Sequence, residues 1–297
     1  MKFGTHQTFG IKNWEGNDLK ARIAKASEIG FDTFELTPFD FLHGNRQDGL
    51  VLADYAHSKN VELVFCCGFP QDCDMVSDDE EIRENGVKYM REMFKLMKEM
   101  DVHMLVGALY GYWPSYRSTI LDPNDKIYIM KRTAEYFKRA AEDADKYDCN
   151  CAIECLNRFE HWLINTGEEC SNFVDMVNNP RVGVHLDTFH MNIEEASIKD
   201  AVLNAGSRLK ALHLAERNRA LPGTSDFLWD DFFGALKQVG FDGYMDIESF
   251  IVTGGTVCAD IALWRDLTGG KSVDELDDLN AQALAFMKSK SREYGLI

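Results

Sequence analysis

Residues 182–195, VGVHLDTFHMNIEE, combine a short apolar run with a dense group of ionisable residues. The apolar run is typical of a buried strand, and it is followed at once by Asp187, His190, Glu194 and Glu195. A carboxylate and an imidazole at the end of a buried strand indicate a functional site when other strands end in the same way. The organisation of the whole chain therefore decides how this stretch is interpreted.

Eight short β-prone runs alternate with longer amphipathic segments along the 297 residues. The runs occupy residues 3–9, 32–36, 62–67, 103–109, 150–156, 181–187, 209–214 and 244–249. Helical patterns are clearest in residues 18–30, 80–100 and 124–148, and the first of these ends at Gly30, a good helix stop.

Strict β/α alternation predicts parallel strands that are joined by right-handed helical crossovers. Eight such units in about 300 residues predict a (β/α)₈ TIM barrel that spans residues 1–297 as a single domain. The main competitor is a doubly wound open sheet. It is disfavoured because the sequence has no GxGxxG after the first strand and no GxxxxGK[ST] anywhere.

Composition narrows the class of protein. Hydrophobic residues make up 45% of the chain, enough for a large core, and no apolar stretch reaches the length of a membrane span. The first ten residues, MKFGTHQTFG, do not have the pattern of a secretory signal, so we expect a cytoplasmic protein. The net charge of −17 argues against nucleic acid as a partner and favours a small, uncharged or cationic ligand. Without an apolar span, we expect no membrane partner.

Eight cysteines are present without any CxxC pair, so we expect reduced thiols rather than disulfides or a zinc site. Cys151 and Cys155 alternate with Ile153 in one β-prone run. In a strand these three side chains share one face, and Glu154 points to the other. The pattern predicts core packing for the cysteines and a different role for the glutamate.

Four of the predicted strands end in polar residues that alternation turns toward the barrel interior: Glu154, Asp187, His213 and Glu248. Three carboxylates and one imidazole at the mouth of a barrel repel one another and lose hydration unless a positive charge joins them. A divalent metal does so, and an oxygen-rich set without thiolate suits Mn²⁺, Mg²⁺ or Co²⁺. The alternative is that these are unrelated polar residues satisfied by salt bridges.

The segments AIECLNRFEHWLINT, VGVHLDTFHMNIEE, HLAERNRALPG and DGYMDIESF resemble the D-tagatose 3-epimerase family, which includes the D-psicose (allulose) 3-epimerases. The resemblance implies an isomerase that inverts C3 of a free ketose of the D-tagatose, D-psicose, D-fructose or L-ribulose class. It implies Mn²⁺ or a similar ion on Glu154, Asp187, His213 and Glu248, with Glu154 and Glu248 as the acid/base pair. It also implies a homo-oligomer, dimer or tetramer, and no nucleotide cofactor.

By the same resemblance, five further residues contact the substrate: Glu160, His190, Arg219, Trp113 and Phe250. The chain departs from the family pattern at Ala215 and Ser249, where we expect altered loop shape. It departs more strongly at residues 6–9, where His6, Gln7 and Phe9 stand in place of the family's aromatic residues over the far end of the sugar.

Four other functions remain open from the sequence. A hydroxypyruvate or xylose isomerase-like enzyme, or an inosose dehydratase-like lyase, would use the same metal and carboxylates. An endonuclease IV-like repair enzyme would need more histidine and carboxylate ligands and a basic surface, and the charge of −17 disfavours it. A sugar-binding barrel without activity would bind the same ligand without exchanging its protons.

Overall fold

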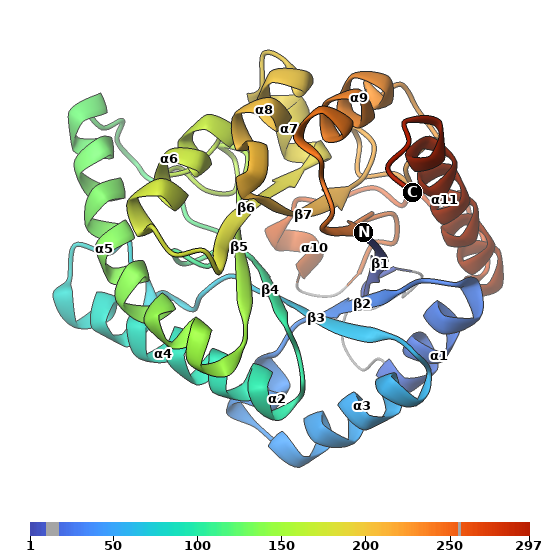
Figure 1. Ribbon diagram of the computed structural model, residues 1–297, viewed down its shortest axis with the longest axis horizontal. Helices are drawn as coiled ribbons and strands as arrows, with labels where there is room; N and C mark the ends of the chain where they lie inside the picture. The colour runs from blue at the N-terminus through green and yellow to red at the C-terminus, as the bar shows by residue number, and fades with distance from the viewer. Residues whose placement is uncertain (10–17, 255–256) are drawn as a thin grey trace.

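The computed structural model describes residues 1–9, 18–254 and 257–297, and its eight strands form a closed parallel barrel (Figure 1). The strands are β1 (Lys2–His6), β2 (Thr33–Leu36), β3 (Glu62–Cys66), β4 (Met104–Gly107), β5 (Asn150–Glu154), β6 (Val182–Asp187), β7 (Leu209–Leu214) and β8 (Tyr244–Ile247). Each strand pairs in parallel with its neighbour in the chain, and β8 pairs with β1. The predicted (β/α)₈ barrel is therefore confirmed.

Helices surround the barrel and cover the outer faces of the strands (Figure 1). They are α1 (Leu19–Ile29), α2 (Phe39–His43), α3 (Arg46–Ser58), α4 (Glu80–Glu99), α5 (Pro123–Tyr147), α6 (Gly167–Val177), α7 (Thr188–Glu194), α8 (Ile198–Ala205), α9 (Trp229–Val239), α10 (Val257–Asp260) and α11 (Val273–Glu293). Two 3₁₀ turns, η1 (Gln71–Cys73) and η2 (Gly206–Arg208), complete the elements. None of the helices in the described ranges is long and apolar enough to span a membrane.

The predicted strands match the observed ones closely, except that the first run was extended too far. β1 ends at His6, because the chain turns there and the backbone N–H of Phe9 donates to the carbonyl of His6 at 3.1 Å. The hydroxyl of Thr8 lies 2.6 Å from Nδ1 of His6 within the same turn. Residues 7–9 therefore form a turn at the barrel mouth instead of lengthening the strand.

Helix α1 begins and ends where the sequence indicates. The side chain of Asp18 accepts a hydrogen bond from the backbone N–H of Ala21 and caps the first turn. Gly30 ends the helix with a φ of 97°, a left-handed conformation that favours glycine.

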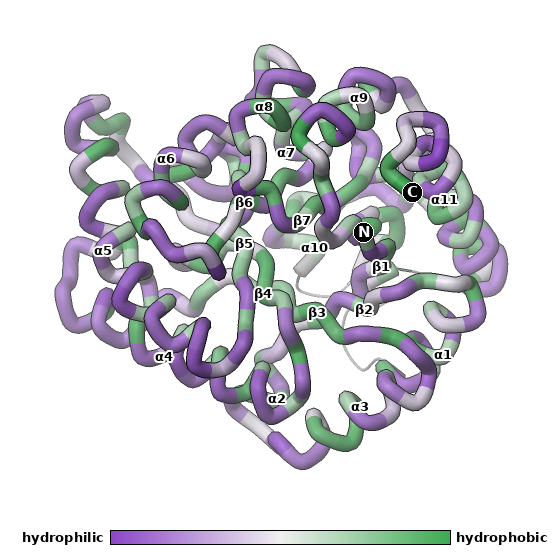
Figure 2. The backbone as a smooth tube through the Cα atoms, viewed as in Figure 1, coloured by the Kyte–Doolittle hydropathy of each residue, from purple (hydrophilic) through white to green (hydrophobic). Residues whose placement is uncertain are grey.

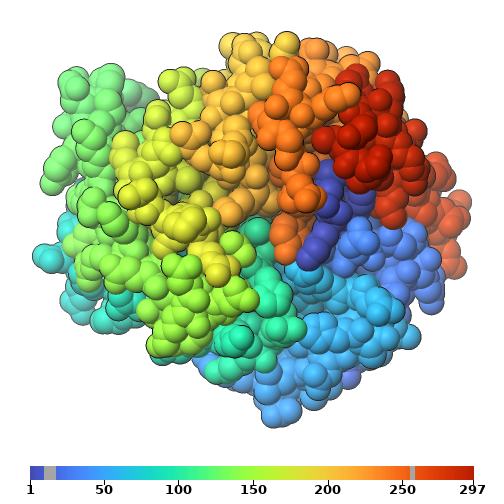
Figure 3. Space-filling view, viewed as in Figure 1, coloured from blue at the N-terminus to red at the C-terminus, as the bar shows by residue number. Residues whose placement is uncertain are grey.

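The start of the chain lies beside the segment that leads into β8, because β1 pairs with β8 and the amino group of Met1 pairs with Asp242 (Figure 3).

The main core lies between the barrel and the helices, and Figure 2 shows hydrophobic residues recurring among hydrophilic ones along α4 and α5. Cys151, Ile153 and Cys155 are buried in this core, and all eight cysteines are free. Core packing of Cys151 and Cys155 is therefore confirmed. A smaller apolar cluster fills the barrel itself, with Val64, Met104, Val106, Ala152 and Ala211 as its buried members.

The register of the strands places the predicted site residues at one end of the barrel. Asp187 lies opposite His213 in the pairing of β6 with β7. Glu154 is the last residue of β5, and Glu248 follows directly after β8, where its backbone N–H donates to the carbonyl of Leu214 at 3.2 Å. Because all four follow the same direction of parallel strands, they meet at the carboxyl-terminal mouth.

Candidate active site

Glu154, Asp187, His213 and Glu248 form a compact, buried cluster. One ligand atom from each lies within 4.8 Å of the others. None of the four side chains is more than a tenth exposed. The fold therefore brings together four strand-end residues that are as many as 94 positions apart in the chain, from Glu154 to Glu248. Their proximity makes the cluster a candidate metal site.

His213 has one bonded ring nitrogen and one that faces the carboxylates. Its Nε2 lies 2.9 and 3.0 Å from the two oxygens of Glu35. Its Nδ1 is buried and makes no hydrogen bond to any of the described residues, although it lies 3.5 Å from Oε1 of Glu154 and 3.4 Å from Oε2 of Glu248. A carboxylate on one nitrogen that turns the other toward an oxygen-rich centre is the usual support of a metal-ligating histidine.

Electrostatics at the cluster favour a positive charge at its centre. Burial raises the pKa of Glu154 to about 8 and also raises that of Asp187. Burial acts to raise the pKa of Glu248 too, but the charges of His213 and Arg219 outweigh it and hold that pKa well below its usual range. Burial acts to lower the pKa of His213, but the surrounding carboxylates outweigh it and raise that pKa. Three carboxylates and an unbonded imidazole nitrogen fit a divalent cation.

Arg219 is the cation that the protein itself supplies to the cluster. Its Nη1 donates to Oδ2 of Asp187 at 2.6 Å and to Oε2 of Glu248 at 2.9 Å. The guanidinium group is also sandwiched between the rings of Phe189 and Phe250, whose centroids lie 4.1 and 4.8 Å from Cζ. Arg219 thus reaches back over the mouth from its loop and bonds two of the predicted metal ligands.

Glu160, His190 and Trp113 form a second group beside the cluster. The indole N–H of Trp113 donates to Oε2 of Glu160 at 3.2 Å. Nε2 of His190 lies 3.5 Å from Oδ2 of Asp187. Burial raises the pKa of Glu160, and burial together with the charge of Arg219 lowers that of His190 well below its usual value. The structure therefore places all three next to the cluster.

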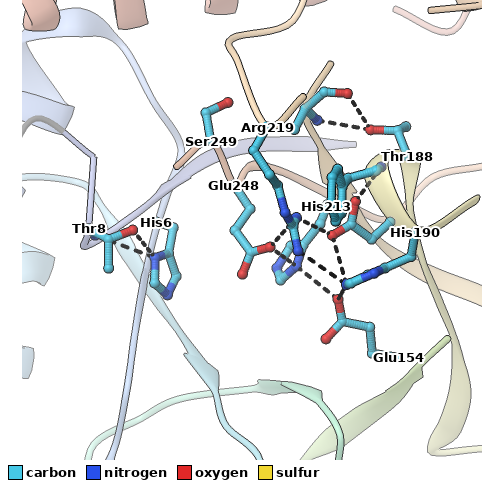
Figure 4. A network of polar contacts seen from close by, with 12 residues as sticks. His6, Thr8, Glu154, Thr188, His190, His213, Arg219, Glu248 and Ser249 are labelled. Carbon is cyan, nitrogen blue, oxygen red and sulfur yellow. Dashed lines mark hydrogen bonds and ion pairs between the residues drawn. The ribbon is translucent and has the colours of Figure 1, made fainter. Parts of the chain in front are cut away.

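These side chains open onto a cavity of about 520 Å³. Four of the residues that line it, Arg219, Glu248, His190 and Glu154, point toward one another (Figure 4). Trp113 and Phe250 belong to its wall, together with other aromatic residues. A cavity of this size with convergent polar groups at one end and apolar walls elsewhere is suited to a small organic ligand.

The residues at which the chain departs from the family pattern have distinct positions. His6 and Gln7 line the cavity, whereas Phe9 is buried in the main core. The hydroxyl of Ser249 donates to the carbonyl of Ala220 at 3.1 Å. Ala215 exchanges two backbone hydrogen bonds with the hydroxyl of Thr188. Phe9 therefore acts in packing, and the two loop positions are held by hydrogen bonds.

Sequence reasoning missed three buried polar residues around the site: Glu35, Asn157 and Glu216. The sequence could have identified Glu35, because this residue stands near the end of the second predicted strand, as Asp187 does on the sixth. Asn157 and Glu216 lie in loops, where a single residue gives no signal of burial. Asn157 contacts Glu160 and His190.

Glu216 holds the loop that carries Arg219. Its carboxylate is fully buried and accepts hydrogen bonds from the backbone N–H of Gly223 at 2.7 Å, the indole N–H of Trp229 at 3.0 Å and the backbone N–H of Phe227 at 3.2 Å. Its backbone carbonyl also accepts from the N–H of Arg219, which has a φ of 66°. Three donors on one buried carboxylate keep the loop in a conformation that L residues rarely adopt.

Replacing Glu216 with alanine is expected to lower the free energy of unfolding by roughly 3 kcal/mol, because three buried N–H donors lose their acceptor. Urea denaturation followed by circular dichroism measures the change. Arg217→Ala is the matched control, since the neighbouring side chain is exposed and pairs with Asp226; we expect it to stay within about 0.5 kcal/mol of the wild type. Equal stability of E216A and R217A would contradict the anchoring role.

Residues 23–288 match the family described as the xylose isomerase-like TIM barrel. The chain is 36% identical to the D-psicose 3-epimerase of Ruminiclostridium cellulolyticum, over 97% of both chains. It is 33% identical to the D-psicose 3-epimerase of Enterocloster bolteae, over 97% of this chain and 95% of that one.

Solved structures that are similar to this chain are also D-psicose 3-epimerases. A crystal structure of D-psicose 3-epimerase with D-tagatose from Clostridium cellulolyticum H10 has a TM-score of 0.92, 35% identity, and coverage of 97% of this chain and 99% of that one. A D-psicose 3-epimerase in the presence of D-fructose has a TM-score of 0.91 and 32% identity, with 99% of each chain covered. The chain therefore belongs to the xylose isomerase-like TIM barrels and, within them, to the D-psicose 3-epimerase family of ketose 3-epimerases, which are isomerases.

Proposed function

We propose that this protein is a metal-dependent enzyme that inverts C3 of a free ketose. The observation that carries the proposal is the buried cluster of Glu154, Asp187, His213 and Glu248, in which Nδ1 of His213 faces the carboxylates and has no hydrogen bond within the part of the chain that the structure describes. These four residues would hold the cation, and Mn²⁺ is our first choice, with Co²⁺ or Mg²⁺ as alternatives. When bound, the cation supplies Lewis-acid stabilisation of the negative charge that develops on a ketose oxygen as the C3 proton leaves.

Glu154 and Glu248 are the proposed acid/base pair. Inversion at C3 needs a carboxylate that removes the proton from one face of the ketose and a carboxyl group that returns one to the other face. The protein gives the two groups opposite tendencies, because burial favours the protonated form of Glu154 and the charges of His213 and Arg219 favour the ionised form of Glu248. Environments that separate two carboxyl groups in this way suit a pair that must hold one proton between them.

Arg219, His190 and Glu160 are the proposed contacts to the ketose oxygens near C1 to C3. All three line the cavity beside the cluster, and their N–H and carboxylate groups offer both donors and acceptors to hydroxyl groups. Trp113 and Phe250 are proposed to lie against the apolar faces of the sugar. Binding by convergent polar groups at one end orients C3 between the two glutamates.

The sugars named for similar proteins suggest the substrate class. Two of the similar crystal structures are described with D-tagatose and with D-fructose, and a relative from Methylomonas that is 30% identical is named L-ribulose 3-epimerase. We propose a free ketose of this group as substrate. We also propose a cytoplasmic homo-oligomer, dimer or tetramer, which sedimentation analysis of the purified protein tests.

Incubation of the metal-loaded protein with D-fructose, D-tagatose, D-psicose, L-ribulose and sorbose in D₂O tests the function directly. We expect ketose products that are inverted at C3 and carry deuterium there, followed by NMR and chromatography. An aldose product with deuterium at C2 would identify a sugar isomerase instead, and a dehydrated product would identify a lyase. Binding without any exchange would show that the barrel is not an epimerase for these sugars.

A further inference from the structure

Asn157 lies three residues beyond the end of β5 and is buried against His190. Its backbone N–H donates to Nδ1 of His190 at 3.1 Å, and its side-chain Nδ2 lies 2.7 Å from the same nitrogen. Nδ2 also donates to Oε1 of Glu160 at 3.0 Å. Asn157 therefore contacts two of the proposed substrate-binding residues, Glu160 and His190, and two of its donors converge on Nδ1 of His190.

The neighbours of Asn157 fix the orientation of its amide. Oδ1 accepts a hydrogen bond from the backbone N–H of Phe159 at 2.9 Å, which only the oxygen end of the amide can do. The other end faces the carboxylate of Glu160 and must be the NH₂ group. A flipped amide would lose both of these hydrogen bonds, so the group beside Nδ1 of His190 is a donor.

This arrangement determines where His190 carries its proton. A backbone N–H is always a donor, so Nδ1 of His190, which accepts from Asn157, has no proton of its own. A neutral imidazole whose Nδ1 is unprotonated carries its hydrogen on Nε2. The hydrogen bonds from Asn157 thus select one of the two neutral tautomers.

The Nε2–H group of His190 points into the active site. Nη2 of Arg219 lies 3.2 Å from this nitrogen, and Oε1 of Glu154 lies 3.8 Å from it. Arginine could donate to Nε2 only in the other tautomer, in which both donors of Asn157 would lose their acceptor on Nδ1. The closest oxygen of Asp187 is 3.5 Å away and already accepts from Nη1 of Arg219. Two donors that converge in this way are complementary to one acceptor oxygen placed between them.

We propose that Asn157 is a positioning residue that holds His190 in its neutral Nε2–H tautomer, so that His190 and Arg219 together donate to one oxygen of the ketose. The identity of that acceptor rests on the proposed function. In this tautomer His190 has no lone pair facing the substrate, so it cannot take the proton from C3. Proton removal is then left to the two glutamates.

Long-range ¹H–¹⁵N correlation spectra of the Mg²⁺-loaded protein, labelled with ¹⁵N at its histidines, test the tautomer without any measurement of activity. The signals of His190 are identified by their loss in H190N. We expect the pattern of a neutral ring with the proton on Nε2. A proton on Nδ1, or on both nitrogens, at neutral pH would overturn the proposal.

Two variants of Asn157 separate tautomer selection from simple packing. Asn157→Ala keeps the backbone donor, so the Nε2–H tautomer should persist and kcat/KM should fall about 10-fold through looser orientation. Asn157→Asp places a carboxylate oxygen beside Nδ1 and should draw the proton there, with a loss in kcat/KM on the order of 10²-fold or more. N165A is the matched control, because the amide of Asn165 bonds the backbone carbonyls of Leu156 and His161 in the same loop. Its histidine spectrum should match that of the wild type.

The outcomes are distinguishable from failure of the proposed function. If N157D keeps the Nε2–H pattern, or is as active as N157A, Asn157 does not select the tautomer. If neither variant folds, the spectrum of the wild-type protein still decides. If the wild type shows the Nε2–H tautomer but epimerises no ketose, the tautomer stands and the proposed function fails.

Discussion

Replacing Asp187 with asparagine is expected to abolish both cation binding and epimerisation while the protein stays folded. Asp187 contributes one of the three carboxylates of the cluster, and without its charge the site loses much of its attraction for a divalent ion. The amide oxygen of the asparagine would still cap helix α7, where Oδ1 of Asp187 accepts from the N–H of Phe189 at 2.7 Å. We expect kcat/KM to fall on the order of 10³-fold, with metal content measured by elemental analysis and folding by circular dichroism.

Two further variants make the metal prediction quantitative. His213→Ala removes the nitrogen ligand and should also lose the ion. Glu35→Gln keeps an oxygen for the Nε2–H of His213 but removes the charge behind it, so cation affinity should fall only 10- to 100-fold, roughly as for other residues that support a metal ligand. Full activity of the wild type after thorough chelation, with no metal found by elemental analysis, would contradict metal dependence altogether.

The barrel could be predicted because its signals are local and repeated. Each strand is a short apolar run, each long helix shows hydrophobic residues at intervals of three and four, and the alternation recurs eight times. An error in one run therefore does not change the count of units. The prediction of a strand over residues 7–9 was wrong because Phe9, although hydrophobic and buried, reaches the core from a turn.

The residues of the cluster could be predicted because strand direction and side-chain alternation together fix where a strand-end residue points. The same rule applied to the second strand would have found Glu35, which touches His213 rather than the cavity. Loop residues follow no such rule. Nothing in the sequence shows that Asn157 and Glu216 are buried, because their positions depend on hydrogen bonds to residues that only the folded loops bring near.

Arg219 shows how loop and strand positions combine. Its place six residues after His213 allowed a position over the mouth, but its left-handed backbone and its hydrogen bonds to Asp187 and Glu248 depend on the folded loop. Because Arg219 bonds an oxygen of Glu248, it lowers the pKa of that carboxyl group, whereas Glu154 has no such hydrogen bond from arginine among the described contacts. The surroundings thus make the two glutamates unequal.

Glu154→Gln and Glu248→Gln should each lower epimerisation on the order of 10³-fold or more. A complete reaction needs proton removal on one face of the ketose and proton delivery on the other, and each variant lacks one of these groups. Glutamine still offers an oxygen ligand, so metal content must be measured in both variants, because loss of the ion would mimic loss of the base. Glu160→Gln is the matched control. Glu160 is also a buried carboxylate of the cavity, but it lies outside the cluster, so its replacement should slow turnover without stopping inversion.

Partial reactions in D₂O distinguish the two glutamates. Starting from one C3 epimer, the variant that keeps the base for that epimer should exchange the C3 proton slowly without inverting it, and the other variant should do so only from the opposite epimer. The reason is that each carboxylate faces one side of the planar intermediate and reaches the proton on that side alone. NMR of the recovered ketose measures deuterium at C3 and inversion separately. Near wild-type epimerisation by both metal-replete variants would show that the two-carboxylate mechanism is wrong for this protein. Inactivation of only one variant, with exchange from both epimers in the other, would instead assign both proton transfers to a single mobile base.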